Sequence, residues 1–478
     1  MTRPVAGDPV EQGRLPHEAV QDGRGLDREG HGDHRALPRR AFLKYGVAGA
    51  GTVMLGQAAS RALASVPFPK ADQFDAEAPT AWADLSLRLV RQTAGYTPPV
   101  ASRAFAYAGL ALFEALVPGI PEGRTLSDRL QGIPELPRAG RNREYDWPTV
   151  ANAALADISH RLFATATADN HLAIDALERG FADRFRSSLP LGVFDRSVQR
   201  GRDVAAVIFE WSRSDGGHEA YLHNFPPYAP PVGPGLWVPT PPGFLPAMQP
   251  YWGSCRMFAL PSGAACPPDD PTPYSEDPES RFFTEALEVY DAVKALTQQE
   301  RDIAEFWSDD PGATPTPPGH SISILTQTMR ARGSSLDQAA EAYAKVGIAV
   351  ADAFICCWYI KYRVNLLRPV TYIRAHIDPA WSSLLVTPPF PDFTSGHSVQ
   401  SGAAAQVMTH LFGQVAFTDH THDDRGLTPR SFDSFDDAAA EAAVSRLYGG
   451  IHYRPAIDLG LLQGRCIGAH VSALQLRG

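Results

Sequence analysis

Three short segments in the last third of the chain combine cationic, histidine and small residues at spacings suited to binding an oxyanion. The first segment contains Lys361 and Arg368, which are followed by Pro369. If one helix carries both cations, seven positions correspond to two turns, and both side chains project from the same face. Two cations placed in this way repel each other unless an anion lies between them. Taken alone, such a pair is more often a solvated surface feature.

The second segment, Ser395-Gly396-His397, precedes a predicted helix over residues 398–412. The first turn of a helix offers unpaired amides and the positive end of the helix dipole, and glycine lets an anion approach the backbone closely. Ser395 adds a hydroxyl donor, and His397 could move a proton at near-neutral pH. Taken alone, the tripeptide is equally typical of a simple helix cap.

The third segment contains Arg446, the pair Gly449-Gly450 and His452. Arg446 adds a third cation whose planar fork suits tetrahedral oxyanions. The glycine pair is expected to break the helix and redirect His452, which as a neutral imidazole could be a nucleophile or a metal ligand. Each segment alone is weak evidence, but the three together predict an oxyanion-binding site.

In order and spacing, the segments resemble the signature of the type 2 phosphatidic acid phosphatase and vanadium haloperoxidase superfamily. That signature runs Lys, six residues, Arg-Pro; then Pro-Ser-Gly-His; then Ser-Arg, five residues, His, three residues, Asp. The first segment matches completely, whereas Thr394 replaces the proline of the second. In the third, Ala456 stands where the family has aspartate, and Asp458 is the suggested substitute. The family aspartate orients the essential histidine, so this departure bears on its support.

The resemblance is strong over residues 336–470 and extends weakly upstream. Trp307 and the run Pro317-Pro-Gly-His320 are similar to the bacterial, soluble branch of the vanadium haloperoxidases. Membrane-embedded lipid phosphatases of the superfamily are short and hydrophobic, unlike this chain. The resemblance therefore implies a two-bundle helical architecture with the superfamily core at residues 336–470.

The resemblance also implies a role for each matching residue. The vanadate oxygens would be held by Lys361, Arg368, Ser395, Gly396 and Arg446. His452 would bind vanadium, and His397 would be the acid–base residue. The substrates would be hydrogen peroxide and a halide or organic molecule. Phe390 falls where chloroperoxidases of the family carry phenylalanine, which favours chloride over bromide, although Phe390 could also simply pack the loop.

Two other functions use the same residues. A phosphatase would bind the phosphate group of a phosphomonoester in the cationic site, with His452 as the nucleophile and His397 protonating the leaving oxygen. A non-catalytic phosphate- or vanadate-binding protein is the third alternative. It is favoured only if the missing aspartate has disabled His452.

Helices must position these segments, and the hydrophobic periodicity predicts an all-α fold. We expect an amino-terminal helical half over residues 65–214 and a carboxy-terminal half over residues 281–478. A connecting loop over 215–280 is rich in Pro, Gly and aromatic residues, and is expected to be ordered because its aromatic side chains need burial. The expected helices are 81–93, 100–116, 149–167, 173–188, 194–212, 282–296, 298–307, 321–332, 336–367, 395–412, 436–448 and 456–476.

The first 64 residues read as a twin-arginine signal segment. Arg39-Arg40 precedes a weakly apolar stretch, and Ala62-Leu63-Ala64 supplies small residues at the expected cleavage site. We therefore expect export and a periplasmic or extracellular location. The longest other apolar run, residues 346–360, contains Asp352 and is shorter than the roughly 20 residues of a membrane span, so no stable span is expected after signal removal.

Charge and the remaining reactive residues set further limits. The formal net charge of −10 argues against a nucleic-acid partner, and nothing indicates the oligomeric state. Export permits a disulfide, for which Cys255 and Cys266 are the natural pair. His320 could line a substrate entrance or begin a helix. His410, His420 and His422, with their neighbouring aspartates, could form a loose cation site, but a solvated acidic loop is the favoured interpretation.

Overall fold

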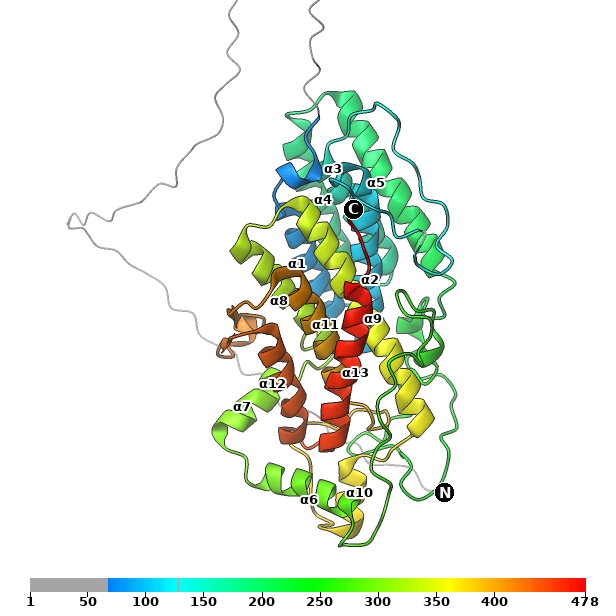
Figure 1. The fold of residues 1–478 in the computed structure, drawn as a ribbon, viewed down its shortest axis with the longest axis vertical. Helices are drawn as coiled ribbons and strands as arrows, with labels where there is room; N and C mark the ends of the chain where they lie inside the picture. Colours follow the sequence, from blue (N-terminus) through cyan, green and yellow to red (C-terminus); the bar gives the residue numbers. More distant parts are fainter. Residues whose placement is uncertain (1–67, 128) are drawn as a thin grey trace, which may run out of the picture. The chain divides into compact units, whose positions relative to one another are not determined.

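The computed structural model describes residues 68–127 and 129–478, so the expected signal segment lies outside the described residues. The fold is mostly helical, which confirms the predicted all-α class (Figure 1). The described residues form α1 (Glu77–Gln92), α2 (Pro98–Leu116), α3 (Trp147–Leu162), α4 (Ala168–Arg186), α5 (Leu191–Ser212), α6 (Arg281–Lys294), α7 (Gln298–Phe306), α8 (Thr316–Arg332), α9 (Leu336–Val364), α10 (Pro369–His376), α11 (Gly396–Phe412), α12 (Phe435–Tyr448) and α13 (Arg454–Ser472).

The remaining regular elements are short. One antiparallel hairpin pairs β1 (Phe417–Asp419) with β2 (Arg430–Phe432). Short 3-10 helices occur at Ala71–Gln73, Val117–Gly119, Ala220–Leu222, Trp252–Ser254 and Asp423–Arg425.

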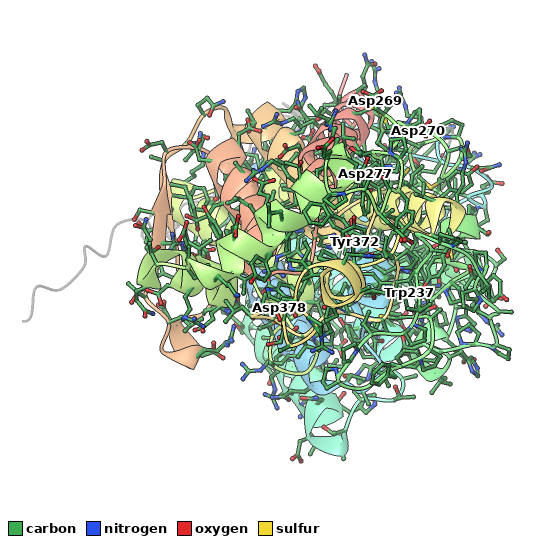
Figure 2. The ribbon with its side chains drawn as sticks, turned by 90° about the horizontal axis from the view of Figure 1, so that it is seen from below. Trp237, Asp269, Asp270, Asp277, Tyr372 and Asp378 are labelled. Atoms are coloured by element: carbon green, nitrogen blue, oxygen red, sulfur yellow. A yellow bond between two sulfur atoms is a disulfide. The ribbon has the colours of Figure 1, made fainter. Side chains whose placement is uncertain are left out.

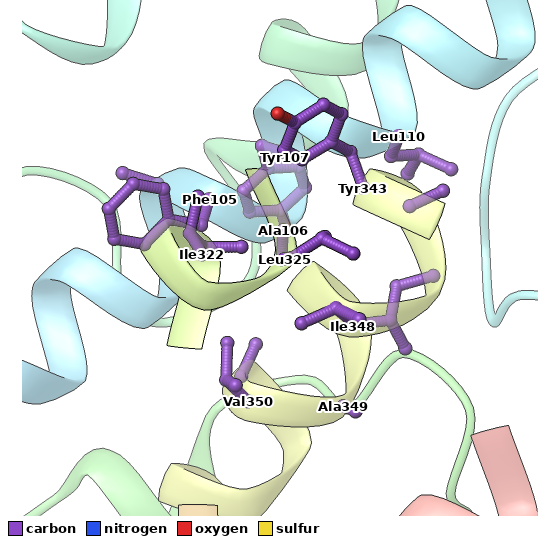
Figure 3. Packing of buried hydrophobic residues seen from close by; sticks show 14 of the residues in the cluster. Phe105, Ala106, Tyr107, Leu110, Ile322, Leu325, Tyr343, Ile348, Ala349 and Val350 are labelled. Atoms are coloured by element: carbon purple, nitrogen blue, oxygen red, sulfur yellow. The ribbon is translucent and has the colours of Figure 1, made fainter. Parts of the chain in front are cut away.

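The centre of the core is the packing of α2 along α9, with α8 beside them. Figure 3 shows Tyr107 and Leu110 of α2 close to Tyr343 and Ile348 of α9. The two helices approach closely because glycines lie at the crossing: a Cβ on Gly109 would be 2.3 Å from the Tyr343 carbonyl oxygen. Such contacts fix the position of α9, whose last turn carries Lys361.

A second close pair, α11 and α13, positions the histidine segments. A Cβ on Gly464 of α13 would lie 2.1 Å from the Val399 carbonyl oxygen of α11, so only glycine permits this approach. The first turn of α11 contains His397, and α13 begins two residues after His452. The packing therefore holds two segments, separated by more than fifty residues in sequence, at one end of the same helix pair.

The expected continuous helix through Lys361 and Arg368 is wrong. Helix α9 ends at Val364, because Asn365 adopts a left-handed conformation with φ of 52°. Arg368 is the extended residue before α10, as expected for a residue that precedes proline. The two cations are thus brought together by the turn between two helices and not by a shared helical face.

The predicted Cys255–Cys266 disulfide is also wrong. Cys266 instead pairs with Cys466 of α13, 200 positions along the chain, and Cys255 is free. The prediction of Cys255–Cys266 rested on their proximity in the sequence, but the fold brings the connecting loop that contains Cys266 against α13. The bond ties that loop to the helix that follows His452.

The segment from His420 to Ser434 is more structured than a solvated acidic loop. It contains β2, and although His420 is exposed, His422 and the neighbouring Asp419 are fully buried. The polar composition of the segment does not reveal this burial, because the partners of Asp419 and His422 lie more than 90 residues earlier in the chain.

Helices α2 and α9 are long and apolar enough to cross a membrane by length and composition alone. Their most apolar windows are 89% and 94% buried inside the fold, respectively. Core helices of globular proteins have the same properties, so this is weak evidence for a span.

Candidate active site

Residues of the second and third segments line a cavity of about 90 Å³. Lys361 and Arg368 of the first segment do not line it, but lie against its lining residues Phe390 and His452. The cavity lies at the first turn of α11, near the end of α9 and the turn between α12 and α13. Its wall has an apolar part and a polar part. The apolar residues include Pro98, Met248, Phe354, Trp358, Leu385 and Phe390; the polar ones include Asp309, Asp310, Gly396, His397, Arg446 and His452.

Lys361 is fully buried and bonds only to neutral groups. Its Nζ donates hydrogen bonds to the carbonyl oxygens of Pro391, at 2.8 Å, and Asp392, at 2.9 Å. Burial, with a contribution from the nearby Arg368, lowers the pKa of Lys361 to about 7. The ammonium therefore sits in a place that disfavours its charge as long as no anion is bound.

Arg368 is also fully buried, and one of its nitrogens has no partner. Nε donates to the Phe390 carbonyl at 2.8 Å, and Nη1 donates to the Ile451 carbonyl at 2.7 Å. Nη2 is buried without any hydrogen-bond partner. Burial lowers the pKa of Arg368 to about 10, although Asp392 opposes the shift. An unpaired, buried guanidinium nitrogen is costly, so it marks a place where an acceptor is expected.

Arg446 contributes the third cation and lines the cavity directly. Its Nη2 donates to the Trp307 carbonyl at 2.6 Å, and its Nε donates to the Ser445 hydroxyl at 2.9 Å. Burial lowers the pKa of Arg446 to about 10, while Asp309 and Asp310 raise it. Carbonyl and hydroxyl groups hold this guanidinium in place without neutralising its charge.

The first turn of α11 forms the floor between these cations. Ser395 is the N-cap residue, and its own amide donates to the Ala456 carbonyl at 2.9 Å. A Cβ on Gly396 would come no closer than 3.6 Å to any neighbour, the nearest being the Trp358 ring. Packing does not require glycine here, so its missing side chain leaves room at the helix N-terminus that a Cβ would fill.

His397 is half-buried at the cavity wall, and its Nε2 is buried without a hydrogen-bond partner. Burial lowers its pKa well below the usual value, and the charge of Arg446 lowers it further. The imidazole is therefore neutral at pH 7 and offers one unpaired nitrogen to whatever occupies the cavity.

His452 is held between a cation and a carboxylate. Its Nε2 lies 3.1 Å from Arg368 Nη1, and its Nδ1 lies 2.9 Å from Asp392 Oδ1. The second contact is short but is not aligned as a hydrogen bond. Burial lowers the pKa of His452 well below its usual value, and Arg368 and Lys361 add to the effect. Because arginine can only donate, Nε2 is the accepting nitrogen and the ring proton belongs on Nδ1.

The carboxylate near His452 therefore comes from Asp392, and the suggested substitute Asp458 is elsewhere. Asp458 is exposed on α13, close to Arg454, and lines a separate open cavity together with Asp269 and Asp270. Figure 2 shows Asp269 and Asp270 next to each other at one edge of the fold. The spacing from His452 suggested Asp458 because that residue lies close to His452 in the sequence, whereas Asp392 lies 60 residues earlier. Asp392 lies three residues before Ser395, just ahead of the second segment, and an aspartate at that place is the only sequence signal for it.

Phe390, the predicted halide residue, does line the cavity. Its ring centre lies 5.0 Å from Lys361 Nζ and 4.9 Å from the guanidinium carbon of Arg368. Its other neighbour is the ring of Trp358, with 4.8 Å between centroids. The ring therefore shields both cations from solvent, in addition to packing the loop.

Behind the cavity lies a buried group that sequence spacing did not assemble. His320 Nδ1 lies 2.9 Å from Asp309, and its Nε2 lies 2.6 Å from Asp419. Burial lowers the pKa of His320, but the two carboxylates outweigh it and raise the pKa to about 10. His320 is thus a charged residue in the first turns of α8, and it is not among the residues that line the cavity.

The suggested cation site at His410, His420 and His422 does not form within the described residues. His422 instead groups with Asp309 and His320, and His420 pairs with Asp423 at the surface. His410 belongs to neither group.

Comparisons with known proteins agree with this geometry. The family model for the second helical-bundle domain of the vanadium chloroperoxidases, "VCPO second helical-bundle domain", matches residues 341–477. A search of curated proteins finds no matching sequence. Among solved structures, a bacterial vanadium-dependent iodoperoxidase is 36% identical, with a TM-score of 0.76, and the match covers 84% of this chain and 97% of the iodoperoxidase.

Two structures of bacterial vanadium-dependent chloroperoxidase share the fold at lower identity. The holo form is 18% identical with a TM-score of 0.62, and the match covers 80% of this chain and 93% of that chain. The apo form is 17% identical with a TM-score of 0.58, covering 78% and 94% respectively. The resemblance inferred from the three segments is thereby confirmed, and the chain belongs to the vanadium haloperoxidase family.

Proposed function

We propose that this protein is a vanadate-dependent haloperoxidase that oxidises a halide with hydrogen peroxide in the cavity described above. The observation that carries the proposal is the convergence of three buried cations and two neutral histidines on one small space. His397 Nε2, at the cavity wall, and Arg368 Nη2, of the guanidinium beside His452, are both buried without a hydrogen-bond partner. Guanidinium, ammonium and backbone amide donors of this kind fit a compact oxyanion.

The residues would divide the work of holding vanadate. The cations Lys361, Arg368 and Arg446 would neutralise its oxygens, and the first turn of α11 would add amide donors. His452 Nε2, whose lone pair is free of a proton, would bind the vanadium atom. When bound, vanadate would supply a Lewis acid that activates hydrogen peroxide toward attack by halide.

His397 is suited to proton transfer in this reaction. Oxidation of a halide by peroxide to hypohalous acid and water consumes one proton for each turnover. The neutral imidazole could accept a proton from hydrogen peroxide at Nε2 and return it to a departing oxygen. Because the pKa of His397 is lowered, its imidazole is unprotonated at pH 7 and can accept this proton.

We infer that iodide is the preferred halide. The support is the 36% identity with an iodoperoxidase over nearly all of its length, compared with 17–18% for the two chloroperoxidase structures. Chloride, favoured from Phe390 alone, is the alternative. Steady-state rates with iodide, bromide and chloride at one peroxide concentration distinguish the two, since a chloride rate equal to that of iodide contradicts the inference.

The proposed reaction is tested by titrating phosphate-free, chelator-treated protein with orthovanadate and measuring peroxide-dependent triiodide formation. Activity should rise to saturation with vanadate and should be lost in His452→Ala. His470→Ala is the matched control, because His470 is an exposed histidine on α13, the helix that follows His452. If vanadate never supports iodide oxidation but p-nitrophenyl phosphate is hydrolysed, the site works as a phosphatase with His452 as the nucleophile. Phosphate binding without either reaction leaves a non-catalytic oxyanion-binding protein.

We also propose that the protein is exported through the twin-arginine route. The support is the Arg39-Arg40 pair with the apolar stretch and small residues that follow. Fractionation of cells that express the full chain tests this, with Arg39→Lys/Arg40→Lys as the comparison. Equal cytoplasmic retention of both forms contradicts it.

A further inference from the structure

We propose that Asp392 is the positioning residue that orients His452, in place of the carboxylate that the superfamily signature has at position 456. This inference rests on the proposed function, because it assigns support to the histidine expected to bind vanadium. Position 456 is alanine here, so its side chain cannot accept a hydrogen bond. Within the described residues, the carboxylate in contact with His452 Nδ1 is that of Asp392, at 2.9 Å.

The location of Asp392 makes it a substitute for the missing side chain. Both Asp392 and Ala456 are almost fully buried, and the Ala456 carbonyl accepts a hydrogen bond from the amide of Ser395, three residues after Asp392. The loop before α11 is thus attached to the first turn of α13, where the family aspartate would be. Asp392 and position 456 therefore belong to two segments that are joined by a hydrogen bond close to His452.

Asp392 is held rigidly enough to act as an orienting group. Its own amide donates to the Leu366 carbonyl at 3.0 Å, and its carbonyl accepts from Lys361 Nζ at 2.9 Å. Asp392 also lies 3.9 Å from Arg368 Nη1, the group that faces the other nitrogen of His452. Asp392 therefore contacts Lys361 through its backbone carbonyl, and contacts Arg368 and His452 through its carboxylate.

The two neighbours of His452 favour the same tautomer. Arg368 donates to Nε2, so that nitrogen must carry its lone pair, and the Asp392 carboxylate attracts the proton to Nδ1. The resulting imidazole presents an unprotonated Nε2 to the cavity, as a metal ligand requires. Among residues 68–127 and 129–478, the side-chain polar contacts of the ring are those with Arg368 and Asp392, so removing Asp392 removes one of the two constraints on its rotation about χ2.

The experiment compares Asp392→Ala, Asp392→Ala/Ala456→Asp and the control Asp458→Ala, an exposed carboxylate on the same helix as Ala456. Vanadate affinity is measured by ⁵¹V NMR in the absence of peroxide and halide. The Asp392→Ala variant should bind about 10- to 100-fold more weakly. Ala456→Asp should restore most of the affinity because it returns the carboxylate to the family position, and Asp458→Ala should bind like the wild type.

A second readout does not need vanadate. Histidine-selective ¹⁵N labelling, with His452→Gln to assign the signal, reports the tautomer of His452 in the oxyanion-free protein. The wild type should show the Nδ1–H form, and Asp392→Ala should shift the equilibrium toward Nε2–H. Asp392→Asn keeps an acceptor oxygen and serves if the alanine variant does not fold; it should retain the Nδ1–H form.

The outcomes separate this inference from the proposed function. Wild-type levels of vanadate affinity and an unchanged His452 tautomer in Asp392→Ala would overturn it. A loss of affinity that Ala456→Asp does not repair, with an unchanged tautomer, would show a purely structural role and overturn it too. Absence of vanadate binding in the wild type would contradict the proposed function, while the tautomer would still decide the role of Asp392.

Discussion

Replacing Lys361 by methionine should reveal how much the burial of its charge destabilises the folded protein. The pKa of Lys361 falls from 10.5 to about 7 on folding, chiefly through burial. At about 1.4 kcal/mol per pH unit, this corresponds to about 5 kcal/mol of unfavourable charge burial at neutral pH. The loss of two hydrogen bonds from Nζ to the loop carbonyls offsets part of the gain, by about 1–3 kcal/mol for each carbonyl left unpaired.

The pH dependence separates these two effects. Between pH 7 and pH 10.5 the unfolded wild type binds a proton at Lys361 that the folded state releases, so wild-type stability falls as the pH is lowered through this window. Lys361→Met lacks this term. Its free energy of unfolding, minus that of the wild type, should therefore increase by about 1.4 kcal/mol for each pH unit from pH 10 down to pH 7, and should level off below pH 7.

Urea denaturation in phosphate-free buffers at several pH values measures this difference. Lys345→Met is the matched control, because Lys345 is a buried lysine of the same helix that is paired with Glu341 at 3.1 Å. Saturating orthovanadate should abolish the pH dependence for Lys361, since a bound anion restores the charged form. A pH-independent difference for Lys361→Met, or the same pattern in both variants, would refute the reasoning.

Three further substitutions test the support of the site. His320→Asn should lower the free energy of unfolding by about 3–5 kcal/mol, because it leaves two buried carboxylates without their cation. The pKa of His320 is raised from 6.5 to about 10, so this loss of stability should be complete below pH 6.5 and should vanish as the pH rises through 10. Urea denaturation at several pH values measures it. Loss of the Cys266–Cys466 disulfide, by serine substitution of both, should cost about 2–5 kcal/mol, and Tm should then no longer respond to reductant. Gly464→Ala should lower Tm and weaken vanadate binding together, because its methyl group would lie 2.1 Å from a carbonyl oxygen of α11; an unchanged Tm would contradict the proposed role of the α11–α13 contact.

Much of the fold and most of the site residues could be predicted from the sequence. Helices with a clear apolar periodicity, such as α2 and α5, agree with their expected ranges to within a few residues. Lys361, Arg368, Gly396, His397 and Arg446 could be named because each lies in a short segment whose spacing is unusual. Their roles in binding and catalysis remain predictions, since geometry shows only that they converge.

The errors arose where a partner is distant in sequence. Cys266 forms a disulfide with a residue 200 positions away. The carboxylate of Asp419 contacts the imidazole of His320, 99 positions earlier in the chain. No local pattern records such contacts. The sequence does not reveal the end of α9, because Asn365 can adopt a left-handed conformation at little cost and the helix ends without glycine. The role of Asp392, like that of Asp419, depends on a partner far away in the sequence, in this case His452.

The central claim is that Lys361, Arg368, Arg446 and His452 form one vanadate-binding site. Crystals grown with orthovanadate, measured near the vanadium absorption edge, test it most directly. The account predicts a single strong anomalous peak in the cavity, at bonding distance from His452 Nε2, with oxygens in hydrogen-bond contact with the three cations. A vanadium peak bonded to any other residue, or a cavity without vanadium in crystals of protein that vanadate has activated, would contradict the claim.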